Sequence, residues 1–199
     1  MARNVAILVF DNVEVLDFAG PFEIFAVTGQ RNGGEAPFNV YTVAEKPGTI
    51  SARNNLIVQP HYTIDNCPPP DLFIIPGGAG SRVVMKNPVI LDWVRRQHER
   101  TALTLSVCTG ALVLGYAGLL DGLQATTHYG AYETLAEISP QIEVIRGVRY
   151  VDNGKVVTSA GVQAGMDMSL HIVARLLGED VARETAHYIE YLWEPQPQP

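Results

Sequence analysis

The chain has 199 residues, of which 47% are hydrophobic and 18% charged, so it carries enough apolar material for one ordinary domain. Its net charge of −7 and its lack of a basic run argue against nucleic-acid binding through a basic face, and no apolar run has the length of a membrane span. Two cysteines, Cys67 and Cys108, are too few for a disulfide framework, so we expect a cytoplasmic protein. We expect one domain over residues 1–193 and a Pro/Gln-rich tail over 194–199.

Short apolar runs alternate along the chain with helix-like segments, which is the pattern of an α/β domain with a mostly parallel sheet. We expect strands over residues 5–10, 38–44, 71–75, 103–107, 144–150 and 155–157. We expect helices over residues 16–25, 88–100, 109–118 and 132–138, after the loop at 159–165 through 177, and over 181–192. Further loops are expected at residues 30–37, at Asn54-Asn55 between two arms at 48–52 and 56–60, and at Asp152-Asn153-Gly154.

Three polar features of the sequence follow predicted strands. Asp17 comes after the first strand, Pro76-Gly77-Gly78 after the strand at 71–75, and Cys108 directly after the strand at 103–107. Ligands of open parallel sheets lie beyond the carboxyl ends of the strands, so we expect these features to meet at one edge of the sheet. The sequence therefore predicts a thiol-based site at that edge.

Cys108 stands between an apolar strand and a helix that starts with small residues, which is the arrangement of a nucleophile elbow with Cys in place of Ser. Free N–H groups at a helix start favour a thiolate and can hold an anion that develops on a substrate. The alternative is a buried cysteine that acts as a small hydrophobe. Gly77 and Gly78 form either a tight turn or a backbone donor to an oxyanion. Asp17 is either a site residue or the cap of a helix that starts at Pro21.

The motifs Pro76-Gly77-Gly78, Ser106-Val107-Cys108-Thr109-Gly110 and Ala125-Thr126-Thr127-His128 resemble those of the DJ-1/PfpI (ThiJ/PfpI) superfamily, and the resemblance covers nearly the whole chain. Leu16-Asp17-Phe18-Ala19-Gly20-Pro21 and Gly161-Val162-Gln163-Ala164-Gly165-Met166-Asp167 are similar to the isocyanide hydratases within it. The resemblance implies a flavodoxin-like (class I glutamine amidotransferase-like) α/β sandwich with helices on both faces. It also implies a homodimer that acts on a small-molecule substrate.

The resemblance also implies roles for individual residues. Cys108 is the expected catalytic nucleophile, Asp17 its acid/base partner, and Thr109 a catalytic neighbour. The backbone of Gly77 and Gly78 is expected to hold the substrate or its developing charge.

Three further positions bear on the site. Val162 stands beside the nucleophile, where the hydratases have Ile, and Tyr129 stands where Trp is common. His128 is a competing base, because a Cys–His pair is the commoner arrangement in thiol hydrolases. The alternative for His128 is a structural, hydrogen-bonded histidine.

The activity implied by the resemblance is the addition of water to an isocyanide, giving an N-substituted formamide through a cysteine thioimidate. The alternatives are an amidase or peptidase, a cofactor-free glyoxalase, and a non-enzymatic redox or ligand sensor, since the same motifs occur in sensor domains of some AraC-type regulators. The sequence contains no HExxH motif and no Cys/His cluster, so we expect neither a metal nor another cofactor.

Overall fold

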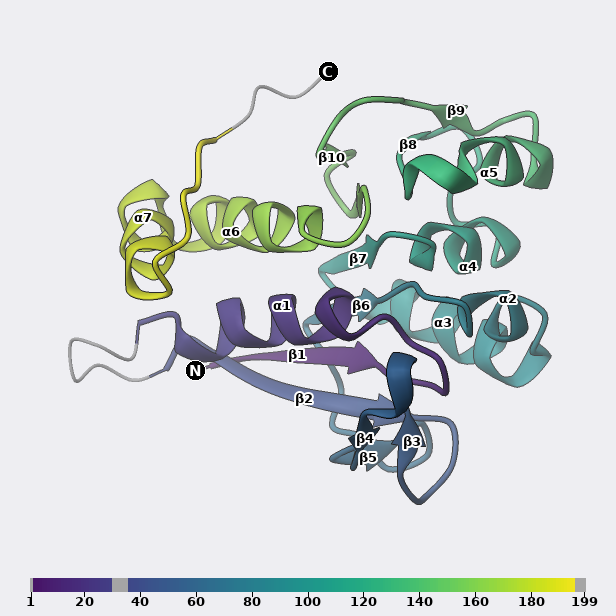
Figure 1. The fold of residues 1–199 in the computed structure, drawn as a ribbon, viewed down its shortest axis with the longest axis horizontal. Helices are drawn as coiled ribbons and strands as arrows, with labels where there is room; N and C mark the ends of the chain where they lie inside the picture. The colour runs from purple at the N-terminus through teal and green to yellow at the C-terminus, as the bar shows by residue number, and fades with distance from the viewer. Residues whose placement is uncertain (1, 30–35, 196–199) are drawn as a thin grey trace.

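The computed structural model describes residues 2–29 and 36–195, whose main feature is a seven-stranded sheet (Figure 1). The strands lie in the order β10-β11-β7-β6-β1-β2-β5. Their bounds are Arg3–Leu8 (β1), Phe38–Ala44 (β2), Tyr62–Thr63 (β5), Leu72–Ile75 (β6), Leu103–Val107 (β7), Tyr150–Asp152 (β10) and Val156–Ser159 (β11). Every neighbouring pair is parallel except β10 with β11, so the predicted mostly parallel sheet is confirmed.

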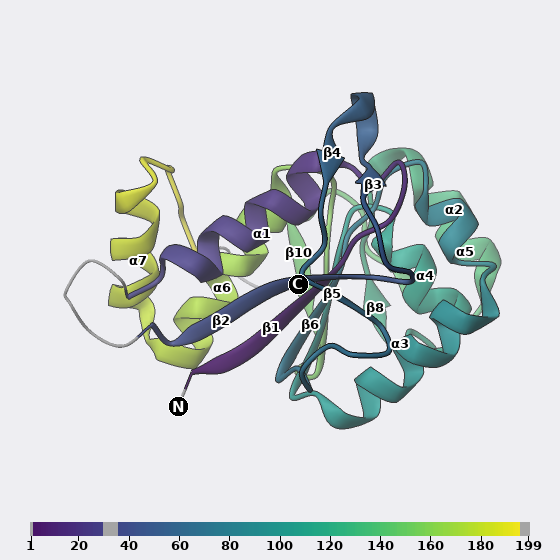
Figure 2. The same cartoon turned by 90° about the horizontal axis from the view of Figure 1, so that it is seen from below.

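Helices cover both faces of this sheet, as predicted (Figures 1 and 2). One face is covered by α1 (Val15–Val27), α6 (Ala164–Leu177) and α7 (Glu179–Tyr188). The other is covered by α2 (Ser81–Val84), α3 (Pro88–Arg100), α4 (Gly110–Tyr116) and α5 (Tyr132–Ile138). Successive residues of β1 point to opposite faces, so Val5 and Ile7 join the first core while Ala6 and Leu8 join the second. Burial on both faces explains why the strands are continuously apolar.

The predicted strand at 144–150 is wrong. The chain there forms two short strands, β9 (Glu143–Val144) and β10, and β9 pairs with β8 (Gln124–Ala125) outside the main sheet. Gly147, between β9 and β10, has a φ of 75°, a left-handed conformation that a strand does not continue through.

The end of the last helix and the alternative cap role of Asp17 also differ from the prediction. The last helix ends at Tyr188 rather than at 192, and the chain turns at Glu190, whose φ is 53°. Helix α1 begins at Val15, close to the start of the predicted helix at 16–25, and Pro21 lies inside it, so the alternative of a helix that starts at Pro21 is wrong. Asp17 is therefore a helical residue and not a cap. The predicted loop at 30–37 and the tail at 194–199 fall largely outside the described residues.

Strands β3 (Ile50–Ser51) and β4 (Ile57–Val58) form a separate antiparallel pair, here called the β3–β4 arm. Asn54 and Asn55 make its turn with φ values of 59° and 63°, as the sequence predicts. Two backbone hydrogen bonds tie the arm to the loop after β1, from Asn12 N–H to the Ser51 carbonyl (2.8 Å) and from Arg53 N–H to the Val13 carbonyl (2.9 Å). This contact brings Arg53 next to the start of α1.

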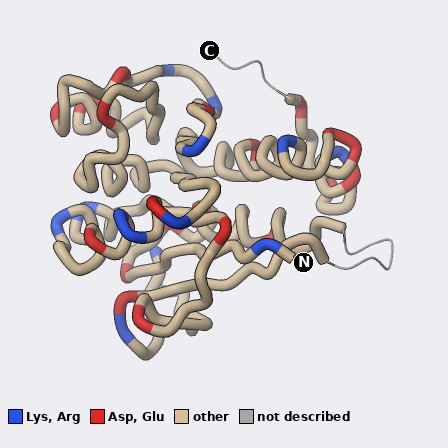
Figure 3. Tube along the Cα trace, turned by 180° about the vertical axis from the view of Figure 1, so that it is seen from behind, with Lys and Arg blue, Asp and Glu red and all other residues tan. Residues whose placement is uncertain are grey.

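Lys and Arg residues are interspersed with Asp and Glu over the helices and loops of the described chain, and they gather on no single face (Figure 3). None of the helices within residues 2–29 and 36–195 is long and apolar enough to cross a membrane.

Candidate active site

Cys108 joins β7 to α4 in a strained turn. Its φ is 57°, a left-handed value that is uncommon for a residue with a side chain, and its side chain is 5% exposed. The turn packs tightly on the neighbouring strand, because a Cβ at Gly110 would lie 2.0 Å from the Ile75 carbonyl oxygen. Strain of this kind persists only where the surrounding structure holds it, and it accumulates at functional sites. The structure thus forms the elbow that the sequence predicts.

Asp17 lies behind the thiol and is completely buried. Its Oδ2 accepts a hydrogen bond from the Gly77 N–H at 3.0 Å, and its carboxyl also interacts with the Cys108 side chain. Its Oδ1 is buried without a hydrogen-bond partner from the described protein atoms. Only glycine fits at position 77, since a Cβ there would lie 2.9 Å from Asp17 Oδ2 and 2.5 Å from the Thr109 nitrogen. The close approach therefore requires the second residue of the Pro-Gly-Gly motif.

Burial raises the pKa of Asp17 to about 7, against the opposing effect of the Gly77 N–H. Burial and the neighbouring Asp17 charge raise the pKa of Cys108 to about 12, while the N–H and hydroxyl of Thr109 lower it. The two groups lie too close to lose both protons near neutral pH. We therefore treat them as one unit that holds two protons below about pH 7 and shares one proton above it.

Thr109 is fixed by the Gly-rich turn after β6. Its Oγ1 accepts a hydrogen bond from the Gly78 N–H at 3.0 Å, and the hydroxyl of the buried Ser81 lies 2.9 Å away. The amides of Gly77 and Gly78 therefore hold the Asp17 and Thr109 side chains in this structure. Their predicted role toward a developing substrate charge stays a prediction.

The Thr-Thr-His segment reaches the site through its second threonine. Thr127 Oγ1 donates a hydrogen bond to the Cys108 carbonyl at 2.8 Å, which supports the strained turn. His128 is half-buried beside the cavity, and its Nδ1 accepts a hydrogen bond from the Gly130 N–H at 3.1 Å. No hydrogen bond joins His128 to Cys108 in the described part of the chain. Sequence reasoning named His128 but missed Thr127, although both stand in the same motif.

A cavity of about 190 Å³ opens at the thiol. Asp17 is not part of its wall, so a ligand would meet the sulfur first. The residues that line it are Glu14, Arg53, Gly78, Ala79, Arg82, Cys108, Thr109, His128 and Val162. A volume of this size suits a small molecule and is below the usual range for drug-sized ligands.

The charged residues of this wall were missed at the sequence level. Arg82 follows the glycine-rich turn closely, so its place at the strand ends carried a readable signal. Glu14 directly precedes α1 and pairs with Arg53 across 3.3 Å. Arg53 reaches the site only because the β3–β4 arm folds onto the loop after β1, and no local sequence pattern announces that contact.

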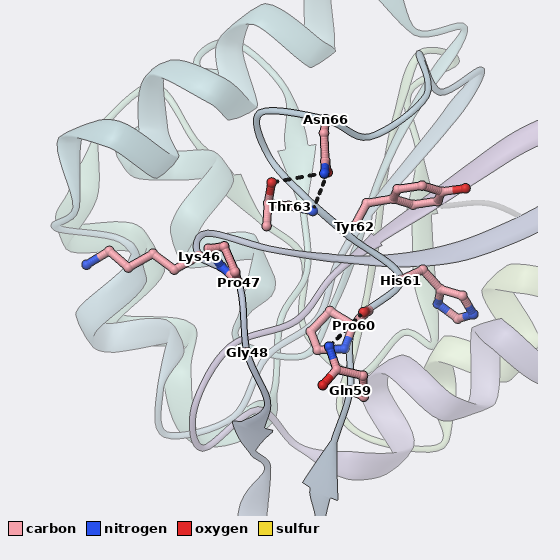
Figure 4. Close-up of a pocket in the computed structure, with 9 residues that line it drawn as sticks. All are labelled: Lys46, Pro47, Gly48, Gln59, Pro60, His61, Tyr62, Thr63 and Asn66. Atoms are coloured by element: carbon pink, nitrogen blue, oxygen red, sulfur yellow. Dashed lines mark hydrogen bonds between the residues drawn. The ribbon is translucent and has the colours of Figure 1, made fainter.

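A second cavity, of about 230 Å³, lies at the β2–β5 edge of the sheet (Figure 4). Several of its polar groups are already paired: Asn66 Oδ1 accepts from the Thr63 backbone and hydroxyl, and His61 Nδ1 bonds to Thr42. No cysteine lines it. The described residues hold no group of three or more His, Cys, Asp or Glu side chains placed to bind a metal ion. The thiol cavity is therefore the candidate active site.

Comparison with known proteins agrees with this geometry. The model of the DJ-1/PfpI family matches residues 3–175. The chain belongs to the DJ-1/PfpI family. Among curated relatives, isonitrile hydratase of Pseudomonas putida is 33% identical over 198 residues, covering 98% of this chain and 81% of that protein. Isonitrile is a synonym of isocyanide.

Solved structures place the fold in the same family. A ThiJ/PfpI family protein from Pseudomonas syringae superposes with a TM-score of 0.85 at 30% identity, covering 99% of this chain and 77% of that one. Drosophila melanogaster DJ-1beta has the same fold, with a TM-score of 0.82 at 18% identity over 97% of this chain and 100% of that one.

The curated sequence relatives also include a transcriptional regulator. GbdR of Pseudomonas aeruginosa is 27% identical over 95% of this chain, which spans 51% of that protein's length.

Proposed function

We propose that this DJ-1/PfpI protein is an enzyme that hydrates a small isocyanide to the N-substituted formamide. The observation that carries the proposal is the pairing of a strained, cavity-facing thiol with a buried acid that interacts with it from behind. An isocyanide carbon is electrophilic and has no leaving group, so its hydration needs a soft nucleophile and one proton held close to it. The Cys108–Asp17 pair supplies both. The 33% identity to an isonitrile hydratase supports the same activity.

The pair can complete the reaction without a net change in its own protons. The sulfur of Cys108 bonds to the isocyanide carbon, and the proton shared with Asp17 goes to that carbon, giving a thioimidate. The Asp17 carboxylate then takes a proton from a water molecule as its oxygen bonds to the same carbon. Asp17 passes that proton to the nitrogen, the C–S bond breaks as the hydroxyl becomes the carbonyl, and the hydroxyl proton returns to the Cys108–Asp17 pair as the formamide leaves. The thiol and the acid regain their starting state, so the sum is isocyanide plus water to formamide.

Thr109 and Val162 complete the site in this proposal. The N–H and hydroxyl of Thr109 lower the pKa of the thiol, so they stabilise sulfur when it carries negative charge. Val162 gives the cavity an apolar wall for the substituent of the isocyanide. Because Gly77 and Gly78 already donate to the site side chains, we assign them a positioning role before any role toward charge on the substrate.

An amidase or peptidase would use the same thiol, but it must also protonate a departing amine, which is the usual task of a Cys-paired histidine. The hydrogen bond of His128 to Gly130 turns its Nδ1 away from that task. A glyoxalase and a redox sensor reuse Cys108 as well, and they become the alternatives if isocyanides are not turned over.

We further propose that the protein works in the cytoplasm as a homodimer. Size-exclusion chromatography with light scattering tests the dimer.

The direct test is formamide production from an alkyl or aryl isocyanide, followed by chromatography. The wild type should form the product, Cys108→Ala should show only the uncatalysed background, and Asp17→Asn should lose about 100-fold or more in kcat. His128→Asn should stay within a few-fold of the wild type. No formamide from the wild type refutes the proposal, and parallel assays with methylglyoxal and amides then identify which alternative holds.

A further inference from the structure

One charged side chain at the site cavity has no role in the reaction above. Arg82 lines the cavity with Cys108 and Thr109, and it is exposed. Within the described residues its guanidinium has neither an ion-pair nor a hydrogen-bond partner. An arginine that borders a reactive thiol and is not neutralised by the protein is available to a ligand.

The backbone that carries Arg82 is held firmly against the nucleophile. The preceding residue, Ser81, is fully buried, and its hydroxyl lies 2.8 Å from the Gly78 carbonyl and 2.9 Å from Thr109 Oγ1. Gly80 packs so closely on the loop after β1 that a Cβ there would lie 1.9 Å from the Asp11 carbonyl oxygen. Arg82 therefore starts from a fixed point next to Thr109, and only its side chain is free to move.

Apart from the Cys108–Asp17 pair, the charged side chains of the cavity wall do not compensate Arg82. Arg53 and Glu14 face each other across 3.3 Å, so their charges cancel locally. His128 accepts a hydrogen bond at Nδ1 from the Gly130 N–H. The chain as a whole carries a net charge of −7, which repels anions. A free arginine at this cavity therefore attracts anions locally, although the net charge of the protein repels them.

We propose that Arg82 is a specificity-determining residue that binds a carboxylate group of the substrate. The guanidinium fork matches a carboxylate with two parallel hydrogen bonds, which a neutral substituent cannot form. The cavity, at about 190 Å³, is small enough for one short molecule to contact both the Cys108 sulfur and the Arg82 side chain. This inference deepens the proposed isocyanide hydration and rests on it for the reacting group: the substrate class is a small isocyanide that carries a carboxylate.

Alkylation of Cys108 tests the anion site without any need for turnover. Iodoacetate and iodoacetamide both alkylate a thiolate with loss of iodide, and they differ in having a carboxylate or a neutral amide. The ratio of their rates at Cys108, read by peptide mass spectrometry, cancels the thiolate fraction because both reagents meet the same sulfur. A cysteine-containing peptide gives the ratio for a free thiol, and Cys67 is followed separately in the same digest.

We expect the iodoacetate/iodoacetamide ratio at Cys108 to exceed that of the free peptide thiol. Arg82→Ala should lower it by about two- to fivefold, the range for one charge contact that is open to solvent. Arg82→Lys should retain part of the ratio, because it keeps the charge but loses the two parallel hydrogen bonds. Arg96→Ala, an exposed arginine of α3 that does not line the cavity, is the matched control and should leave it unchanged. Equal ratios in the wild type and Arg82→Ala overturn the proposal, as does a Cys108 that iodoacetamide alkylates and iodoacetate does not.

A turnover arm links the anion site to the substrate. We expect the wild type to favour isocyanoacetate over its methyl ester in kcat/KM, and Arg82→Ala to lose this preference through a higher KM for isocyanoacetate. If neither isocyanide is hydrated while the alkylation ratio still depends on Arg82, the reaction is wrong and the anion site stands. If both isocyanides are hydrated with equal kcat/KM in the wild type and in Arg82→Ala, the reaction stands and the role of Arg82 is overturned.

Discussion

Replacing Asp17 by Asn should make the protein more stable at alkaline pH while it destroys the site. The substitution keeps the shape of the side chain and an oxygen for the Gly77 N–H, but it removes a buried group that ionises. In the wild type this carboxyl has its pKa raised from 3.8 to about 7, chiefly by burial. Between those values the native state holds a proton that the unfolded chain has released.

The size of the effect follows from that difference. Because the native state binds the extra proton, the free energy of unfolding falls as pH rises through the window between the two pKa values. Between pH 5 and pH 8 the loss comes to about 2.5 kcal/mol, at 1.36 kcal/mol per pKa unit. The amide of Asp17→Asn does not ionise in this range. Its free energy of unfolding relative to the wild type should therefore rise by about that amount over the same interval.

Urea denaturation followed by circular dichroism, at pH 5 and at pH 8, measures the change. The diagnostic is the difference between the two pH values, because any constant cost of the amide cancels in it. Asp65→Asn, at an exposed position, is the control and should show no such pH dependence. A wild-type-minus-variant difference that is the same at both pH values would mean that Asp17 titrates normally, and the account of the buried acid would be wrong.

Three further predictions follow from the geometry of the site. Gly77→Ala should cost about 2 kcal/mol of stability or more and abolish activity, because its Cβ would lie 2.5 Å from the Thr109 nitrogen; wild-type behaviour in thermal denaturation and turnover would contradict the packing described. Thr127→Val should lower stability by about 1 kcal/mol and reduce kcat, because the Cys108 carbonyl would keep only its longer hydrogen bond from the Ala111 N–H (3.4 Å), whereas Thr127→Ser should restore both. The pH profile of kcat/KM should rise about tenfold per unit up to about pH 7 and then level off, since the reacting form of the Cys108–Asp17 pair holds one proton; a profile that falls through pH 7 would require the doubly protonated form instead.

The fold and the centre of the site could be predicted because they are written in local patterns. Continuous apolar runs identified the inner strands, and the Cys108 elbow followed from a strand, a cysteine and a helix of small residues in direct succession. Asp17 was placed correctly near the thiol by its position after the first strand, although the alternative of a cap for a helix that starts at Pro21 was left open. The structure shows that α1 starts at Val15 and passes through the proline.

What could not be predicted depends on contacts between distant segments. Arg53 reaches the cavity through backbone hydrogen bonds between the β3–β4 arm and the loop after β1, and nothing in either segment alone requires them. The strand expected at 144–150 has suitable residues, but Gly147 takes a left-handed conformation and divides it. Burial of Asp17 is also a property of the assembled core. Its raised pKa therefore has no counterpart in the sequence.

The central claim is that the Cys108 sulfur forms a bond to the isocyanide carbon during turnover. Rapid acid quench of the wild-type protein with excess aryl isocyanide, followed by mass spectrometry of the Cys108 peptide, tests it most directly. The account predicts that this peptide gains the mass of one isocyanide in the first turnovers, while the Cys67 peptide stays unmodified. Release of formamide with the Cys108 peptide unmodified at every quench time would contradict the account.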